Sequence, residues 1–150
     1  MFFMDDYLEF QVGKFIFKVA TDRLYSDEGI WVKSGDGLAE VGISDYLQQR
    51  SGDVAFAEIK PRETIIKTGD ELVVIETIKV NISLTSPVTG KVIEVNSVME
   101  TAPEVINQDP YGAGWLVKIE LAGGDAGLNT LLNPQEYFEK TRHEAEQEVK

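Results

Sequence analysis

Side chains that commonly carry catalysis are scarce in this 150-residue sequence. His143, its one histidine, lies in a polar segment, and the sequence shows no partner that would hold it as a general base. The sequence has no cysteine, which excludes a thiol nucleophile, a disulfide and a thiolate metal site. Neither of the common glycine-rich phosphate-binding motifs is present. The sequence therefore favours a protein that enzymes act upon over one that turns over a substrate alone.

Lys79 lies in a segment whose apolar residues alternate strictly with polar ones from residue 78 to residue 85. Such alternation is typical of a half-buried strand, and by this pattern alone Lys79 lies in mid-strand and points to water. Glu76, three residues before it, has the same plain interpretation as an exposed strand residue. A lysine ammonium, with a pKa of about 10.4, is not nucleophilic at neutral pH, so an enzyme must deprotonate it before acylation. Only flanking motifs can therefore distinguish a modified Lys79 from an ordinary surface lysine.

The elements that position Lys79 are predicted to be mostly short strands. Gly13 is expected to interrupt the first of them, Pro87 to end the alternating segment, and Gly90 to form a tight turn. Runs rich in β-branched and aromatic residues predict strands over 10–20, 31–32, 38–43, 54–59, 72–75, 78–85, 91–95 and 115–121. Many short strands separated by Gly and Pro turns predict a mainly β protein with a sandwich-like or barrel-like core.

Two helices are expected at the margins of this core. Ser44 is a candidate N-cap for a short helix over 45–50 that ends near Gly52. Asn133 is a second candidate N-cap, because Pro134 follows it at the first helical position. The charged segment behind Pro134 is therefore expected to form a C-terminal helix with a solvated face.

Composition excludes several classes of partner. The formal net charge of −12 repels phosphate backbones, so we expect no binding to nucleic acid. No apolar run approaches the roughly 18 residues that a membrane-spanning helix needs, so we expect no membrane insertion. The first ten residues carry acidic residues rather than the basic start of a secretory signal, and we expect a cytoplasmic protein.

Several segments around Lys79 resemble the glycine cleavage H-protein family. Residues 76–79, Glu-Thr-Ile-Lys, look like the family's lipoyl-attachment motif Glu-Ser-Val-Lys. Residues 86–92, Ser-Pro-Val-Thr-Gly-Lys-Val, match its Ser-Pro-Val-Ser-Gly-Glu-Val. Further matches in the same order and spacing are found at residues 41–46, 52–54 and 107–119. Each motif alone is weak, whereas their common order and spacing from about residue 25 to residue 138 identify the chain as a member.

The resemblance implies a fold and a modification. The fold is a barrel-sandwich hybrid, the lipoyl-domain-like β-sandwich, with short peripheral helices and a C-terminal helix. The family carries its cofactor, covalently bound lipoate, on a lysine at an exposed hairpin tip, which is Lys79 here, and Glu76 is implied to help a lipoate ligase or transferase recognise that lysine. We expect an N-terminal extension with a packed strand over 1–24, an H-protein-like lipoyl domain over 25–138 and a charged helical tail over 139–150.

The resemblance also implies a function, that of a non-catalytic carrier subunit. Such a carrier shuttles an aminomethyl group and reducing equivalents between glycine decarboxylase, an aminomethyltransferase and dihydrolipoyl dehydrogenase. Ile78 and Val80 flank the lysine where biotin carriers usually have methionines, which favours lipoate over biotin. Ile30 stands where the family has a glutamate that holds the aminomethylated arm, so the resemblance predicts a poor substrate for glycine decarboxylase that Ile30→Glu improves.

Two alternatives remain open at this point. Some H-like proteins are lipoate carriers in other pathways, such as sulfur oxidation with heterodisulfide-reductase-like enzymes, and a carrier of this kind is the first alternative. A relative that has lost the carrier function and serves as a binding module is a further alternative, although the presence of both Glu76 and Lys79 argues against it.

Overall fold

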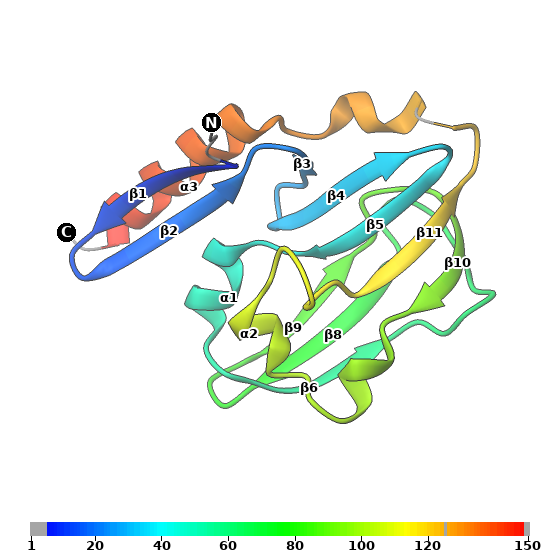
Figure 1. The fold of residues 1–150 in the computed structure, drawn as a ribbon, viewed down its shortest axis with the longest axis horizontal. Coiled ribbons are helices and arrows are strands. Elements are labelled where there is room, and N and C mark those ends of the chain that lie inside the picture. The colour runs from blue at the N-terminus through cyan, green and yellow to red at the C-terminus, as the bar shows by residue number, and fades with distance from the viewer. Residues whose placement is uncertain (1–5, 125, 149–150) are drawn as a thin grey trace.

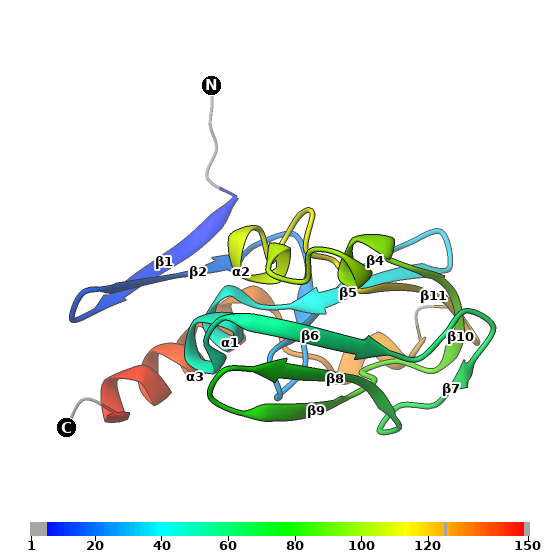
Figure 2. The ribbon, with the colours of Figure 1, turned by 90° about the horizontal axis from the view of Figure 1, so that it is seen from below.

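The computed structural model describes residues 6–124 and 126–148, which fold into two facing β-sheets with a hairpin and a helix at one end (Figures 1 and 2). Residues 1–5 of the expected N-terminal extension and 149–150 of the expected tail lie outside the described residues. The strands are β1 (Tyr7–Val12), β2 (Phe15–Ala20), β3 (Leu24–Tyr25), β4 (Ile30–Gly35), β5 (Leu38–Ile43), β6 (Val54–Ile59), β7 (Ile65–Ile66), β8 (Glu71–Thr77), β9 (Asn81–Thr85), β10 (Gly90–Val95) and β11 (Val117–Leu121). The helices are α1 (Asp45–Ser51), α2 (Val105–Gln108) and α3 (Pro134–Glu148), with short 3₁₀ turns η1 (Ser97–Glu100) and η2 (Ala126–Thr130).

The core lies between a six-stranded and a three-stranded antiparallel sheet. The larger sheet has the order β3-β4-β5-β11-β10-β7, and the smaller has the order β6-β8-β9. Figure 2 shows the two sheets as separate layers, and the buried side chains of both form one apolar cluster that includes Ile30, Val41 and Ile75. The predicted mainly β, barrel-sandwich class with peripheral helices is confirmed.

The cap residues place both helices where the sequence expects them. Ser44 accepts a hydrogen bond from the Leu47 amide at 3.1 Å and begins α1, and Gly52 caps its end with a φ of 91°. Asn133 accepts a bond from the Glu136 amide at 2.8 Å while the Glu136 carboxylate accepts one from the Asn133 amide at 2.9 Å, which forms a capping box at the start of α3.

The structure differs from the predictions made for Gly13 and Gly90. Gly13 does not merely interrupt a strand over 10–20, because its φ of 62° turns the chain so that β1 and β2 pair as a hairpin. The tight turn predicted at Gly90 is wrong, since Gly90 is the first residue of β10 and pairs with Leu121. A Cβ atom at Gly90 would lie 2.1 Å from the Glu120 carbonyl oxygen, so glycine is required there for close approach of β11 rather than for a turn.

The β1–β2 hairpin stands beside the sandwich and packs on α3 (Figure 1). A separate apolar cluster joins it to both α1 and α3; its buried members are Phe10, Val12, Phe17, Tyr46 and Ala145. Phe10 and Phe17 lie 5.0 Å apart between ring centroids, and Phe17 meets Tyr46 of α1 edge-on at 5.2 Å. The hairpin is therefore fixed against the first turn of α1, through Tyr46, and against α3.

Candidate functional site

Lys79 lies at the tip of the β8–β9 hairpin. The Thr77 amide donates to the Val80 carbonyl at 2.8 Å, and the Thr77 hydroxyl accepts from the amides of Lys79 at 3.1 Å and Val80 at 3.0 Å. A threonine hydroxyl that satisfies two following amides stabilises a turn in place of a continuing strand. The mid-strand position that alternation predicts for Lys79 is therefore wrong, and the lysine lies at the hairpin tip that the resemblance implies.

The Lys79 side chain runs from this tip back along the end of α1. Its ammonium donates to the Arg50 carbonyl at 3.0 Å, and its Cδ would lie 3.4 Å from a Cβ atom placed on Gly52. The last carbonyls of a helix have no intrahelical partner and carry the negative end of the helix dipole, so a cation is favoured there. Arg50 is not among the residues predicted from the sequence, where its only signal is the expected helix end near Gly52.

Glu76 lies in β8, one residue before the turn, and pairs with Asn81 across the hairpin. Its side chain is half-buried, whereas Lys79 is exposed. The Lys79 ammonium bonds to the Arg50 carbonyl and not to Glu76. The structure thus brings Glu76 and Lys79 to the same hairpin end without joining them.

Ile30 is fully buried in the core between the sheets, where it pairs with Ile43 of β5. Glu28 is exposed, and its carboxylate accepts hydrogen bonds from the Thr85 amide at 2.9 Å and the Thr85 hydroxyl at 2.7 Å. Gly29 lies between them with a φ of 99°, so the two side chains do not share the face of a regular strand. Ile30 therefore offers no carboxylate at this position, and the Glu28 carboxylate is bound to Thr85.

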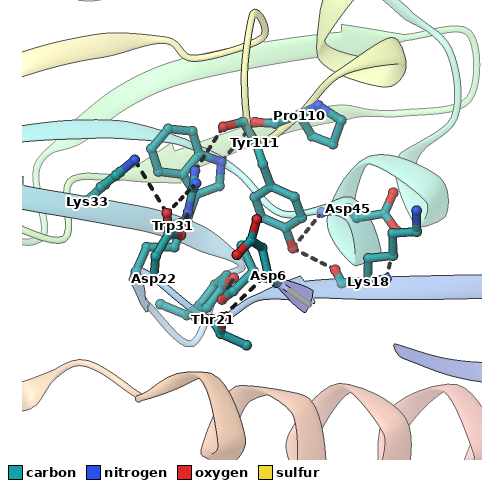
Figure 3. A network of polar contacts seen from close by, with 12 residues as sticks. Asp6, Lys18, Thr21, Asp22, Trp31, Lys33, Asp45, Pro110 and Tyr111 are labelled. Atoms are coloured by element: carbon teal, nitrogen blue, oxygen red, sulfur yellow. Dashed lines mark hydrogen bonds and ion pairs between the residues drawn. The ribbon is translucent and has the colours of Figure 1, made fainter. Parts of the chain in front are cut away.

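A polar network holds β2 against the start of α1 (Figure 3). The Tyr111 hydroxyl donates to the Lys18 carbonyl at 2.7 Å and accepts from the Asp45 amide at 3.2 Å, while the Asp45 carboxylate accepts from the Lys18 amide at 2.9 Å. The Trp31 indole donates to the Pro110 carbonyl at 2.9 Å, which fixes the loop that carries Tyr111. Burial raises the pKa of Tyr111 to about 12, so its hydroxyl keeps its proton at neutral pH.

Replacing Tyr111 with phenylalanine is expected to lower the free energy of unfolding by about 1–3 kcal/mol, because the Lys18 carbonyl and the Asp45 amide lose their partner. The loss should be the same at pH 6 and pH 9, since both values lie below the raised pKa of the phenol. Urea denaturation at both pH values measures it, with Tyr7→Phe as control because Tyr7 is 40% exposed. An unchanged urea midpoint for Tyr111→Phe would contradict this role.

The described residues show neither a metal centre nor a membrane span. Within them, no group of three or more acidic or histidine side chains is arranged to hold a metal ion. No helix among the described residues is both long and apolar enough to cross a membrane.

Comparison with known proteins gives consistent matches. The family model described as glycine cleavage H-protein matches residues 23–144. The chain is 37% identical to the probable glycine cleavage system H protein 1 of Saccharolobus solfataricus, over 89% of this chain and 97% of that protein. It is 36% identical to glycine cleavage system H protein 4 of Aquifex aeolicus, over 98% of this chain and 80% of that protein. The crystal structure of a glycine cleavage system H protein from Mycobacterium marinum aligns with a TM-score of 0.73 at 27% identity, over 81% of this chain and 98% of that one.

Proposed function

The chain belongs to the glycine cleavage H-protein family, and from this premise we propose that it is a lipoyl carrier of the glycine cleavage system with lipoate bound covalently to Lys79. The position of Lys79 at an exposed hairpin tip carries this proposal. The surroundings suit an acylated lysine, because the amide that forms on Nζ keeps one N–H for the Arg50 carbonyl and Gly52 leaves room for the side chain.

The chain's own residues would present the group rather than perform chemistry. When bound, the lipoyl group supplies a dithiolane for group transfer and redox exchange. Attachment through Lys79 keeps this group at a high effective concentration for each partner enzyme that docks. The proposed partners are glycine decarboxylase, the aminomethyltransferase and dihydrolipoyl dehydrogenase, in the cytoplasm. We propose residues 25–138 as the carrier domain, with 1–24 as an extension and 139–150 as a tail.

Glu76→Gln is expected to slow lipoylation of Lys79 without lowering stability. We propose that the Glu76 carboxylate, at the same hairpin end, contributes to recognition by the ligase. An interaction of a charged group with a partner contributes about 1.5–3 kcal/mol, which corresponds to at least about tenfold in rate. The measurement is the initial rate of lipoyl transfer by a lipoate ligase, with urea denaturation to verify equal stability. Equal rates for the variant and the wild type would show that Glu76 is an ordinary strand residue.

The test of the glycine cleavage function is an exchange assay with the lipoylated chain. Glycine decarboxylase exchanges the glycine carboxyl carbon with labelled bicarbonate when a lipoylated carrier is present, and we expect exchange that depends on the lipoyl group. Ile30 is buried and offers the arm no carboxylate, and the Glu28 carboxylate is bound by Thr85, so exchange should be about tenfold slower than with an authentic H-protein, which is the loss expected for one charged hydrogen bond.

The alternative pathway is distinguished by the same assay. No exchange by a fully lipoylated chain would contradict the glycine cleavage function and favour a lipoate carrier of another pathway, such as sulfur oxidation. The relatives reported above all carry glycine cleavage names and give that alternative no support.

A further inference from the structure

Lys79 borders a groove that the sandwich alone does not form. The groove encloses about 310 Å³ between the β1–β2 hairpin, α1 and the end of α3, and we call it the hairpin groove. Its apolar lining comes from Val12, Phe15 and Phe17 of the hairpin, Tyr46 of α1 and Ala145 of α3. The hairpin precedes residues 23–144, which match the family model, so this groove depends on a segment outside that match.

The groove begins where the Lys79 side chain ends. Arg50, whose carbonyl accepts from the Lys79 ammonium at 3.0 Å, lines the groove, as does Lys79 itself. An amide on Nζ retains one N–H and can keep this hydrogen bond, which places the acyl chain at the mouth of the groove. The position of Ile30 on β4 offers no such site for the acyl chain, because the Ile30 side chain is fully buried.

The lining suits a sulfur-containing, otherwise aliphatic group. Phe15 and Phe17 stack with ring centroids 6.2 Å apart, and Phe17 meets Tyr46 at 5.2 Å, so aromatic rings form a continuous wall. Aromatic rings make favourable contacts with sulfur, and burial of methylene groups against apolar walls is favourable. The Phe15 side chain is 50% exposed, which leaves apolar surface that a ligand can cover.

The charges stay at the rim of the groove. Arg50 and Glu148 form an ion pair at 3.0 Å, and both side chains are about half exposed. The enclosed volume lies at the lower end of the range for small-molecule sites. The groove therefore fits a small apolar group better than a segment of a partner protein.

We propose that the dithiolane end of the lipoyl group on Lys79 docks in the hairpin groove, so that the N-terminal hairpin shields the arm between visits to partner enzymes. This inference rests on the proposed lipoylation of Lys79. Docking covers the Phe15 ring and removes the dithiolane from water, and leaving the groove exposes it to a partner's active site.

The test compares the rate at which a water-soluble phosphine reduces the dithiolane in three lipoylated proteins. The phosphine converts the dithiolane to a dithiol and takes up an oxygen from water to become the phosphine oxide. Phe15→Ser removes the exposed wall of the groove, and Ile16→Ser is the matched control, because Ile16 is 51% exposed on the same strand and does not line the groove. Equal urea midpoints verify that both variants are folded.

The wild type and Ile16→Ser should react about threefold more slowly than Phe15→Ser, which corresponds to an arm docked about two thirds of the time. Nuclear magnetic resonance provides a second readout: lipoylation should shift the Ala145 methyl signal in the wild type but not in Phe15→Ser. Equal reduction rates in the wild type and Phe15→Ser, with the lipoyl group present by mass, would overturn the docking site alone. If the chain gained no lipoyl mass from a ligase, the proposed function would be overturned and the docking site with it.

Discussion

Lys79→Arg is expected to abolish lipoylation of the chain. The guanidinium stays protonated at any pH at which the protein is folded, so it offers no nucleophilic nitrogen for acylation. Arginine nevertheless keeps the positive charge and a donor for the Arg50 carbonyl, so the hairpin tip should remain folded. Incubation with a lipoate ligase, followed by digestion and mass spectrometry, should show one lipoyl group on the peptide with Lys79 in the wild type and none in the variant.

Lys67→Arg is the matched control for this experiment. Lys67 is also an exposed lysine close to a turn, since its amide donates to the Asp70 carboxylate at 2.9 Å. This variant should be lipoylated as completely as the wild type. A lipoyl group on any peptide of Lys79→Arg would contradict Lys79 as the sole attachment site.

Ile30→Glu is expected to lower the free energy of unfolding by about 3–5 kcal/mol and not to improve the exchange of glycine. The sequence alone predicts an improvement, because the resemblance implies a glutamate at this position. The burial of Ile30 leads us to expect the opposite result: Ile30 lies fully buried among apolar side chains, so the new carboxylate would have no partner. Ile30→Val is the control and should cost only about 0.5–1.5 kcal/mol, since it removes one methylene group.

The destabilisation by Ile30→Glu should depend on pH. Burial raises the pKa of the introduced carboxyl in the folded state above its ordinary value of about 4.3. Below about pH 4.3 the carboxyl is neutral in both the folded and the unfolded protein. Between about pH 4.3 and the raised pKa of the folded state, it ionises only in the unfolded chain. The deficit relative to the wild type should therefore grow from pH 4 to pH 8. Urea denaturation of both proteins at each pH measures this, and equal stability at pH 8 would show that position 30 is open to water.

Several local elements could be predicted from residues that are neighbours in the sequence. Ser44 and Asn133 cap α1 and α3 as expected, and the strands predicted over 38–43 and 54–59 have the same bounds in the structure. Caps and alternation depend on residues that are close in the sequence, so their physical causes can be read from the chain. The ordered motifs around Lys79 similarly identified the family, and with it the fold class.

The turn at Lys79 was not available from the pattern of apolar residues. Alternation continues through residues 78–85, although the chain reverses direction between Thr77 and Val80. Pairing of β8 with β9 and capture of two amides by the Thr77 hydroxyl fix this reversal. The pattern of polar side chains indicates only which residues are exposed to water. Residues of an exposed turn and residues on the exposed face of a strand are both polar, so the pattern cannot distinguish the turn at Lys79 from a continuing strand.

The surroundings of the Lys79 ammonium could not be predicted from the sequence, because they come from distant segments that pack together. Arg50 is 29 residues away in the sequence, and the hairpin groove combines β1 and β2 with Ala145 and Glu148 near the end of α3. The same holds for Ile30, whose burial follows from the packing of the two sheets rather than from its neighbours in the chain. Contacts between such distant segments depend on how whole elements pack, and no local pattern in one sequence encodes them.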